Sequence, residues 1–304
     1  MDVSIIIVNY NTKDLLKKCL NSIINQTSNI SYEIIVSDNG SQDGSIDMIK
    51  DEFPSVILVE NNANLGFGTA NNKGLSIAKG KYIFYLNSDT ILLNNAIKIF
   101  FDYYETHSHD DIGCIGANLL DKNHSVIHSY DSFPSIFAEI KGLFRAPFYL
   151  TKLFVTYILP RRTLPQYIDN QHQSFFIGEV DRIAGADIFM LNDMNAYFDD
   201  HIFLYFEDTE LQFKLHQMKK HNYLIEGPEI VHLIGGSAIK KLNVLDKMRS
   251  FTNIQYNLSR VYYFKKHHSN YVLYILLKYL TIFYFIQPLM IKYTYPSLKK
   301  LIRM

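Results

Sequence analysis

The sequence has few cysteines, no tryptophan and no excess of either charge. Its two cysteines, Cys19 and Cys114, occur among 304 residues, too few for a disulfide framework or a cysteine-based metal site. Both fall in apolar or helical patterns, so we expect buried thiols in a reducing compartment. Lysine and arginine together number 30, as do aspartate and glutamate. The chain lacks the basic excess typical of nucleic-acid-binding proteins, and we expect no nucleic acid partner.

The chain also lacks the pattern of a secretory signal. It begins MDVSIIIVNYN, with Asp2 where a signal peptide carries positive charge, and the apolar run is only as long as a strand. We find no internal repeat and no low-complexity linker. With 48% hydrophobic residues, the chain can form one large domain, or a domain with an appendage. We therefore expect a cytoplasmic protein.

What the first half contains is a regular alternation of apolar runs and helical patterns. The β-branched runs at 3–9, 32–39, 56–61 and 82–89 are typical of strands buried on both faces. Helical spacing follows in a segment that Asn11 or Thr12 can cap, and again at 43–53, 67–80 and 95–107. This order predicts an α/β fold with a mostly parallel sheet and helices on both faces.

The second half is less regular. Residues 112–120 predict a strand, and 180–192 a further strand that contains the small pair Gly185-Ala186. Residues 223–237 predict a strand pair or a turn. The strand signal therefore continues, but the simple alternation with helices does not.

Polar loops follow four of the predicted strands. Ligands of open α/β sheets bind beyond the carboxyl ends of the strands. Turn-forming residues are common in such loops on structural grounds alone. Four polar loops at one edge, with two carboxylates, nevertheless favour a binding site. The residues concerned are 9–11, 37–41, 61–62 and 87–89, with Asp38 and Asp89 as the carboxylates.

Asp89 and His232 are candidate metal ligands. A single carboxylate suits a divalent cation that is also held by a ligand's phosphates, as Mg²⁺ and Mn²⁺ often are. A histidine nitrogen would favour Mn²⁺. The alternative is structural: Asp89 would cap a helix that starts near Asn94, and His232 would be an ordinary strand-end histidine. Spacing alone leaves both readings open.

Glu207 and Asp208 open a predicted helix whose expected apolar face is Leu211, Phe213 and Leu215. Acidic residues in a first helical turn are favoured by the helix dipole without any further role. The functional alternative is that one carboxylate is a general base for an acceptor hydroxyl.

Three glycines lie around another predicted helix start. Gly66, Gly68 and Gly74 would let a backbone approach a phosphate. The pattern is neither GxGxxG nor a P-loop, so it is a weak signal when it is taken alone.

Seven motifs occur in unbroken order over residues 3–237: VSIIIVNYN, EIIVSDNGSQDGS, NLGFGTANNKG, YIFYLNSDT, VDRIAGAD, YFEDTEL and VHLIGGS. This series resembles the family 2 inverting glycosyltransferases, in particular their bacterial rhamnosyltransferase-like branch. The resemblance implies the GT-A nucleotide-sugar-binding fold, which agrees with the α/β pattern. It also implies an enzyme of the hexosyltransferase class.

The resemblance implies a donor site at the strand ends. The loop with Asn9 and Tyr10, together with Asp38, would hold the nucleobase and ribose. A carboxylate that accepts from a pyrimidine N–H favours uracil or thymine, hence a UDP- or dTDP-sugar. The residues implied near the diphosphate and the sugar are Asn64, Gly66 and Asn72.

It also implies a metal site. Asp89 matches the last acid of the DXD motif, in which Asn87 replaces the first acid and Ser88 stands between them. The branch commonly has Asn-Pro-Asp here, so a single carboxylate remains. His232 matches the histidine that completes the site for Mg²⁺ or Mn²⁺ in relatives.

The acceptor side follows from the last motifs. Asp208 matches the catalytic base, with Glu207 beside it. Gly185 and Ala186 match a small-residue turn that lets the donor sugar approach the acceptor pocket. The implied reaction is one in-line displacement in which Asp208 takes the proton of an acceptor hydroxyl and the configuration at C1 inverts.

The implied function is transfer of a sugar to a cell-surface polysaccharide or a lipid-linked glycan precursor. The branch favours rhamnose, but glucose, galactose or an N-acetylhexosamine would fit the same residues. A nucleotidyltransferase that makes nucleotide sugars is a rival, but it would normally show a glycine-rich N-terminal loop. A non-catalytic sugar-binding scaffold would be expected to lose Asp89, Asp208 or His232, and all three are present.

The C-terminal part predicts a separate helical extension. We expect a glycosyltransferase domain at 1–240, with a nucleotide-binding half at 1–120 and an acceptor-binding half at 121–240, then an extension at 241–304. The extension contains a long helix at 243–267. The sequence leaves the oligomeric state open.

Residues 271–291 are apolar and close to the length of a spanning helix. Lys278 and Pro288 interrupt the segment, and basic residues flank it, which favours a helix lying at the membrane surface over a packed helix or a span. The apolar stretch 133–160 fits a second membrane contact or a groove for a polyprenyl-linked acceptor, and equally an ordinary core or a dimer interface. We therefore expect a peripheral protein at the inner face of the cytoplasmic membrane.

Overall fold

The computed structural model describes residues 1–107, 111–138, 141, 174–193, 196–233, 251–268 and 270–276. Two compact units divide the chain, one made of Met1–Phe133 and Gln171–Lys241 and the other of Pro134–Asn170 and Leu242–Met304. Every predicted site residue lies in the first unit. In the second, helix α8 spans Phe251–His267, and the first part of the long helix predicted at 243–267 falls outside the described residues. The predicted domain limits stay a prediction.

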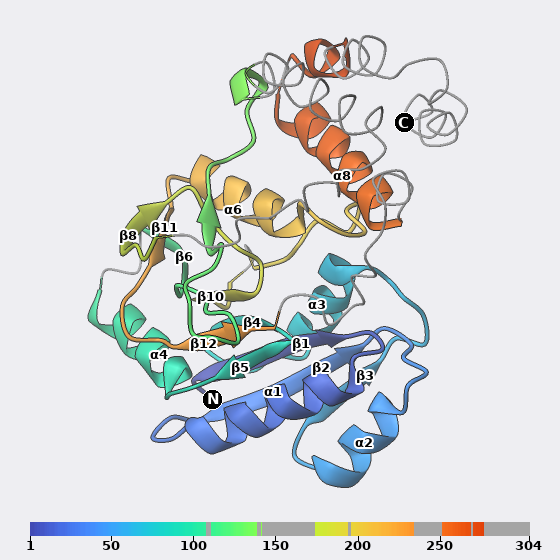
Figure 1. The fold of residues 1–304 in the computed structure, drawn as a ribbon, viewed down its shortest axis with the longest axis vertical. Helices are drawn as coiled ribbons and strands as arrows, with labels where there is room; N and C mark the ends of the chain where they lie inside the picture. The colour runs from blue at the N-terminus through green and yellow to red at the C-terminus, as the bar shows by residue number, and fades with distance from the viewer. Residues whose placement is uncertain are drawn as a thin grey trace, which may run out of the picture. The chain divides into compact units, whose positions relative to one another are not determined.

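The first unit is built on an eight-stranded sheet with the order β3-β2-β1-β4-β10-β6-β11-β8 (Figure 1). Strands β3, β2, β1 and β4 are parallel, and so are β6 and β11. Strand β10 runs antiparallel to both of its neighbours, and β8 antiparallel to β11. The predicted α/β fold with a mostly parallel sheet is confirmed. The strands are β1 Val3–Asn9, β2 Tyr32–Asp38, β3 Ile57–Glu60, β4 Tyr82–Asn87, β6 Ile112–Gly116, β8 Gly178–Val180, β10 Asp187–Leu191 and β11 His221–Leu224.

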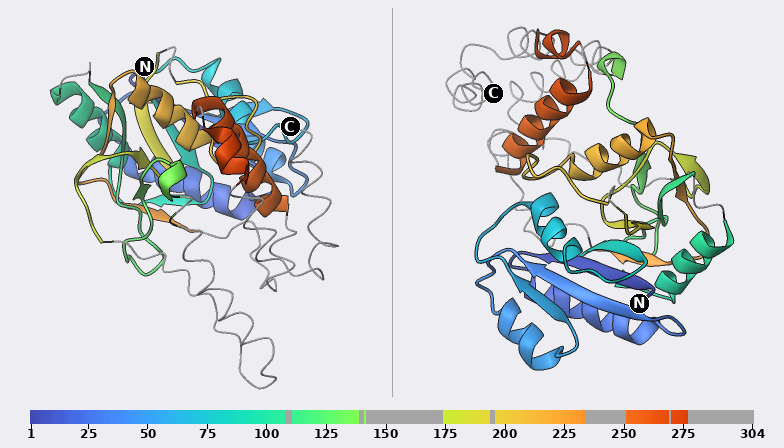
Figure 2. Two further views of the ribbon diagram at one scale, coloured as in Figure 1. Left: turned by 90° about the horizontal axis from the view of Figure 1, so that it is seen from above. Right: turned by 180° about the vertical axis from the view of Figure 1, so that it is seen from behind.

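Helices cover both faces of this sheet because the buried strands are apolar on both sides (Figure 2). Ile5 and Ile7 of β1 belong to a core with helices α1 (Lys13–Gln26), α2 (Ser45–Glu52) and α4 (Ala96–Thr106). Ile6, which points to the other face, belongs to a core with α3 (Phe67–Leu75) and α6 (Glu207–Gln217). Both cysteines are buried and free, as predicted.

Two short antiparallel pairs lie beside the main sheet. Strand β5 (Thr90–Leu92) pairs with β12 (Ile230–His232), and β7 (Tyr130–Asp131) pairs with β9 (Arg182–Ile183). Strands of two or three residues carry no periodic signal, so the sequence did not predict β5, β7 or β9 as separate elements. These pairs matter because they place His232 opposite Thr90 and Asp131 opposite Arg182.

Two predicted elements are corrected in length. The range predicted as one strand at 180–192 contains the last residue of β8 and two separate strands, β9 and β10. Strands β9 and β10 are separate because the chain turns at 184–186, where the Ala186 N–H donates to the Ala184 carbonyl at 2.8 Å. The helix at 67–80 ends at Leu75, and the Gly80 N–H instead donates to the Ser4 hydroxyl at 2.7 Å as the chain enters β4.

The predicted apolar face of α6 is also partly wrong. Leu211 and Leu215 are buried as predicted, but Phe213 is only partly buried, and Gln212 is buried beside the two leucines. Positions 208, 211, 212 and 215 share one face at 3.6 residues per turn, and 213 does not. A polar side chain is therefore buried within this face.

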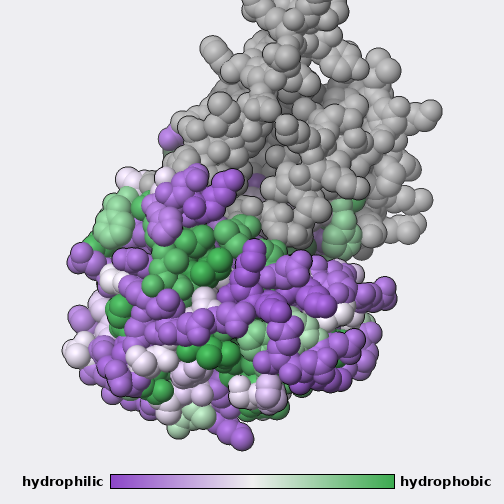
Figure 3. All heavy atoms as spheres, turned by 60° about the horizontal axis from the view of Figure 1, so that its bottom comes forward, coloured by the Kyte–Doolittle hydropathy of each residue, from purple (hydrophilic) through white to green (hydrophobic). Residues whose placement is uncertain are grey.

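The surface of the described residues mixes polar and apolar side chains. The face drawn in Figure 3 is largely hydrophilic, with hydrophobic residues gathered between the polar ones. Within the ranges that the structure describes, no helix combines the length and the apolar character needed to cross a bilayer. The predicted membrane segment 271–291 and the stretch 133–160 lie mostly outside those ranges.

Candidate active site

The strand ends that the sequence singles out meet at one edge of the sheet. Strands β1, β2 and β4 run parallel, so their carboxyl ends lie together. Strand β10 runs the other way, and its first residue, Asp187, pairs with Leu86 near the end of β4. The loops after β1, β2 and β4 and the loop before β10 therefore share this edge, where ligands of open α/β sheets bind.

A continuous hydrogen-bond network joins three of the predicted residues, Asn9, Asp38 and Ser88. The Asn9 side-chain amide donates to Asp38 Oδ2 at 2.7 Å and to Ser41 Oγ at 3.0 Å. The Thr12 hydroxyl donates to Asn9 Oδ1 at 2.6 Å and lies 3.0 Å from the Ser88 hydroxyl. Thr12 holds the N-cap position of α1, but its hydroxyl makes no cap bond and serves this network instead.

Within this network Asp38 and Tyr10 differ in access. Asp38 is completely buried, and Oδ1 already accepts the Ser41 N–H at 2.7 Å while Oδ2 accepts from Asn9. Tyr10 is 47% exposed, so its ring is free to stack on a flat base. The contacts of both with a nucleobase and ribose stay predictions.

Asn64, Gly66 and Asn72 are tied to the start and body of α3. The Gly66 N–H donates to Asn64 Oδ1 at 3.0 Å. Asn72 makes two bonds with the Phe198 backbone, donating to its carbonyl at 2.9 Å and accepting its N–H at 2.9 Å. The Asn72 amide therefore fixes α3 to the segment that leads into α6. The roles of these residues at the diphosphate and the sugar stay predictions.

The glycines around α3 have packing reasons of their own. Gly66 has a φ of +87°, and a Cβ there would lie 2.3 Å from the Phe203 carbonyl oxygen. A Cβ at Gly74 would lie 2.6 Å from Ile6 Cγ2. Close packing against the Phe203 backbone and the Ile6 side chain thus accounts for these two glycines without any phosphate.

Asp89 and His232 are brought together by the β5–β12 pair. His232 Nε2 lies 3.2 Å from Asp89 Oδ1, with the side chains 17% and 19% exposed. The Leu233 N–H donates to the Asp89 carbonyl at 2.8 Å, which fixes the two strand ends together. The predicted pair of candidate metal ligands is therefore adjacent and reachable from solvent.

This pair fits a metal that takes its other ligands from a bound diphosphate. It offers one carboxylate oxygen and one imidazole nitrogen, a set that suits Mn²⁺ and tolerates Mg²⁺. Among the described residues no group of three or more His, Cys, Asp or Glu side chains could form a closed metal cage. The two ligand atoms of the pair would leave the remaining coordination positions of a cation to a bound ligand.

The Asp89 loop is linked to the predicted base through the start of β10. At the end of β4, the Asn87 N–H donates to the Ala186 carbonyl at 3.0 Å. A Cβ on the preceding Gly185 would lie 2.9 Å from Asp208 Cβ and 3.2 Å from its carboxylate oxygen Oδ2. The predicted residues Asn87, Gly185, Ala186 and Asp208 therefore form one connected group.

The two acids at the start of α6 have different environments. Glu207 is only 6% exposed, and burial, with the nearby charge of Asp208, raises the pKa of Glu207 to about 8. Glu207 Oε2 has no hydrogen-bond partner among the residues described. The Asp208 side chain is 18% exposed and faces Arg182 Nη1 at 3.6 Å. Burial thus disfavours the charged form of Glu207, while Asp208 is the more accessible of the two carboxylates. The role of either as a base stays a prediction.

A strained turn sets the direction of this helix start. Tyr205 and Phe206 have φ values of 64° and 70°, a left-handed conformation that costs free energy for residues with a side chain. Such strain clusters at functional sites, where surrounding structure holds it in place. The turn places Glu207 and Asp208 in the first turn of α6.

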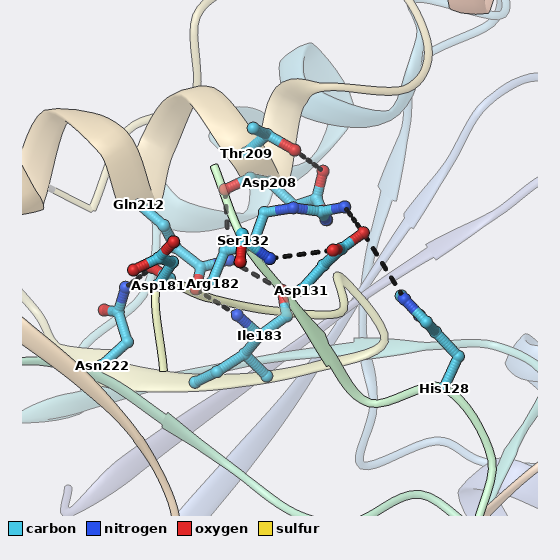
Figure 4. Close-up of polar contacts among 10 residues, drawn as sticks. All are labelled: His128, Asp131, Ser132, Asp181, Arg182, Ile183, Asp208, Thr209, Gln212 and Asn222. Carbon is cyan, nitrogen blue, oxygen red and sulfur yellow. Dashed lines mark hydrogen bonds and ion pairs between the residues drawn. The ribbon is translucent and has the colours of Figure 1, made fainter. Parts of the chain in front are cut away.

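Sequence reasoning missed Arg182, Asp131 and Gln212, which surround Asp208 (Figure 4). Arg182 donates to Asp131 Oδ2 at 2.9 Å, and Gln212 bonds to the backbone of Ile183. One signal could have revealed Gln212: it is a polar residue four positions after Asp208 on a face with Leu211 and Leu215. Arg182 lies within the strand predicted at 180–192, but its pairing with Asp131 is a two-residue ladder that no local pattern reports.

The family model described as "Glycosyl transferase family 2" matches residues 4–178. A poly(ribitol-phosphate) beta-glucosyltransferase of Bacillus spizizenii is 35% identical over 115 residues, which are 36% of this chain and 18% of that protein. The UDP-Glc:alpha-D-GlcNAc-diphosphoundecaprenol beta-1,3-glucosyltransferase WfaP of Escherichia coli is 37% identical over 126 residues, 38% of this chain and 50% of WfaP. The aligned region thus covers at most half of either relative.

The fold is shared with a solved structure. The crystal structure of S. aureus TarS superposes with a TM-score of 0.51 and 14% identity, over 77% of this chain and 37% of that one. At this identity the likeness shows the fold, which is the GT-A-like α/β fold with a mostly parallel sheet. The family match covers more than half of the chain, so the chain belongs to glycosyl transferase family 2.

Proposed function

We propose that this chain is an inverting hexosyltransferase that moves a sugar from a UDP- or dTDP-sugar to a hydroxyl of a cell-surface polysaccharide or a lipid-linked glycan precursor. One observation carries the proposal. The accessible Asp208 carboxylate lies against Gly185, on the sheet edge that also holds the Asn9–Asp38 network and the Asp89–His232 pair. A candidate base, a candidate diphosphate site and a candidate nucleotide site thus share one edge.

The names of two relatives support particular substrates. Both are called glucosyltransferases, one of poly(ribitol-phosphate) and one that takes UDP-glucose to a diphosphoundecaprenol-linked sugar. We therefore favour glucose on UDP as the donor, and a polymer or a lipid-linked glycan as the acceptor. Rhamnose on dTDP, which the branch resemblance favoured, is the second candidate.

In the proposed reaction Asp208 takes the proton of the acceptor hydroxyl. The acceptor oxygen forms a bond to C1 of the donor sugar from the face opposite the diphosphate. The bond from C1 to the diphosphate oxygen breaks, and its electron pair leaves with the diphosphate. The configuration at C1 inverts because bond making and bond breaking occur on opposite faces.

Asp89 and His232 would hold Mg²⁺ or Mn²⁺ in this proposal. A bound divalent cation supplies positive charge that stabilises a leaving diphosphate. The residues of the chain contribute the remaining parts: Asn9 and Thr12 organise the loops at the strand ends, and Glu207 stays neutral beside the base.

We also propose a peripheral membrane contact through 271–291, at the inner face of the cytoplasmic membrane. Val272, Leu273 and Leu276, within the described start of this segment, are apolar and exposed. Basic residues next to an apolar helix favour binding at an anionic surface. Purified protein should float with vesicles that contain anionic lipid, and a protein that stays at the bottom of the gradient contradicts the contact.

A donor screen tests the proposed function. The full chain is incubated with Mn²⁺ or Mg²⁺ and a panel of UDP-, dTDP- and GDP-sugars, and donor hydrolysis and thermal stabilisation are measured. We expect a response confined to one uracil or thymine nucleotide sugar and lost in Asp89→Ala. No response to any nucleotide sugar contradicts the proposal. Pyrophosphate release from a nucleoside triphosphate and a sugar phosphate would support the rival nucleotidyltransferase, and binding without hydrolysis a scaffold.

A further inference from the structure

Arg182 is held between two carboxylates. Its Nη2 donates to Asp131 Oδ2 at 2.9 Å, and its Nη1 lies 3.6 Å from Asp208 Oδ2. The Arg182 and Asp208 side chains are 17% and 18% exposed, so these two charges interact with less screening than a surface pair, whereas Asp131 is 51% exposed. Figure 4 shows the guanidinium between the two acids, with His128 on the far side of Asp131.

Asp131 is a firm partner for this guanidinium. The register of β7 and β9 places Asp131 directly opposite Arg182, and the Ser132 N–H donates to Asp131 Oδ1 at 2.8 Å. Burial raises the pKa of Asp131, but His128 and the charge of Arg182 outweigh it and leave the pKa below its ordinary value. Asp131 is therefore ionised at neutral pH and holds Arg182 in place.

Gln212 fixes the base helix to the strand that carries Arg182. Its side-chain oxygen accepts the Ile183 N–H at 2.7 Å, and its amide donates to the Ile183 carbonyl at 2.9 Å. The same amide lies 3.2 Å from the Asp208 carbonyl, one helical turn earlier. Because Ile183 follows Arg182 directly, this pairing fixes the distance between Arg182 and Asp208.

Gly185 completes the surroundings of the base. The Asp208 side chain occupies the space where a Cβ of residue 185 would be, 2.9 Å from Asp208 Cβ. Arg182, Gly185 and Gln212 thus form what we call the Asp208 seat. Arg182 Nε is buried without a hydrogen-bond partner within the described part of the chain. An unmade bond of this kind costs stability, which favours a functional reason for the arrangement.

We propose that Arg182 is the positioning residue of the base, holding the Asp208 carboxylate in its seat while Asp131 holds the guanidinium. The inference rests on the proposed function of Asp208. These separate roles account for the shorter distance from Arg182 to Asp131, 2.9 Å, and the longer distance to Asp208, 3.6 Å. As Asp208 accepts a proton and loses its charge, Arg182 keeps Asp131 as a partner, so no unpaired buried cation is formed.

Kinetics with UDP-glucose, with water in place of the acceptor, test the proposal in the full chain. We expect Arg182→Gln to lower kcat about tenfold or more, since a small misplacement of a reacting group is costly. The KM for UDP-glucose and the Kd for UDP should change less than about twofold, because the proposed role of Arg182 is to position the base and not to bind the donor. Arg182→Lys, which keeps the charge, should recover part of kcat.

Two further variants separate positioning from simple crosslinking. Asp131→Asn should also lower kcat at unchanged KM, because Arg182 then pairs with the base alone. Lys98→Gln removes the same charge from an exposed ion pair with Asp102 on α4 and should leave kcat unchanged. A crosslink would instead lower thermal stability in Arg182→Gln, with kcat per folded molecule unchanged, and that outcome overturns the inference.

Asp208→Asn distinguishes failure of the inference from failure of the proposed function. If Asp208→Asn retains turnover, the proposed base is wrong. If Asp208→Asn is inactive and Arg182→Gln turns over normally, only the positioning role is wrong. A structural readout needs no turnover: in crystals of Arg182→Gln the Asp208 carboxylate should leave its position against Gly185. An unchanged carboxylate position there also overturns the inference.

Discussion

The two ends of the candidate site differ in how well their polar groups are satisfied. At the end of β1 and β2, the Asn9 amide and both oxygens of the buried Asp38 have hydrogen-bond partners. At the start of α6 and on the neighbouring strand β9, Glu207 Oε2 and Arg182 Nε have none within the described residues. Two left-handed residues, Tyr205 and Phe206, precede this second group.

The difference indicates that the two regions have different roles. A fully satisfied network rigidifies the loops that would receive the nucleotide. Unmade hydrogen bonds and backbone strain persist at the base because the surrounding fold holds them, and such features cluster where chemistry occurs. Changes at the base should therefore alter turnover most, and changes in the network should alter stability most.

The largest expected effect comes from removing the base. Asp208→Asn keeps the size of the side chain but cannot take a proton, so transfer should fall by about 10²–10⁴-fold. Affinity for UDP, measured by calorimetry, should stay within about twofold of wild type, because the proposed base acts on the acceptor hydroxyl and not on UDP. Full turnover in this variant would reject the base.

A second change moves the base without removing it. Gly185→Ala places a methyl group 2.9 Å from Asp208 Cβ, so the carboxylate must shift. We expect turnover to fall by about 10–100-fold and stability by about 1–3 kcal/mol. Steady-state kinetics and thermal melts check this, with Gly178→Ala, whose φ is +132° but whose neighbours are 3.5 Å or more away, as the comparison. Equal kinetics in the two variants would contradict the close packing.

Glu207→Gln should change how the stability of the protein depends on pH. The folded pKa of Glu207 is about 8 against an ordinary value of 4.5. Between these pH values the unfolded chain releases the proton and the folded chain keeps it, so wild-type stability falls as pH rises. Glutamine does not titrate. The free energy of unfolding of the variant relative to wild type should therefore rise by about 3 kcal/mol between pH 5 and pH 8.

Urea titrations of both proteins at several pH values give this difference directly. Other titrating groups are common to the two proteins, so they cancel to first order. A difference that does not change with pH would mean that the carboxyl is ionised in the folded protein.

The smallest expected effect on turnover lies in the network. Asn9→Ala removes the donor to Asp38 Oδ2 and the acceptor of the Thr12 hydroxyl, which should cost about 1–3 kcal/mol of stability. The catalytic step itself should change little, although the KM for the donor should rise as the loops loosen. Denaturant unfolding and donor kinetics check this, and a loss of kcat as large as that of Gly185→Ala would erase the contrast between the two ends.

The polar loops after β1 and β2 could be predicted from the sequence, and much of the group around the start of α6 could not. The strands from Val3 and Tyr32 are long, β-branched and parallel, so their ends and the polar residues that follow are readable from local pattern. Asp208 was identified by resemblance. Arg182 and Asp131 meet through a two-residue ladder between segments 51 positions apart, and no local period reports such a pairing. Gln212 is buried in place of the predicted Phe213 because its side chain hydrogen-bonds to the Ile183 backbone. That contact joins residues far apart in the sequence, so local pattern does not reveal it.

The configuration of the first product distinguishes a single displacement from any mechanism that retains the configuration at C1. Wild-type protein with Mn²⁺ and UDP-α-glucose can be followed by proton NMR at early times, before the released sugar mutarotates. We expect β-glucose as the first product, because water attacks C1 from the face opposite the diphosphate and Asp208 takes its proton. Release of α-glucose would contradict the single displacement, and with it the role of Asp208.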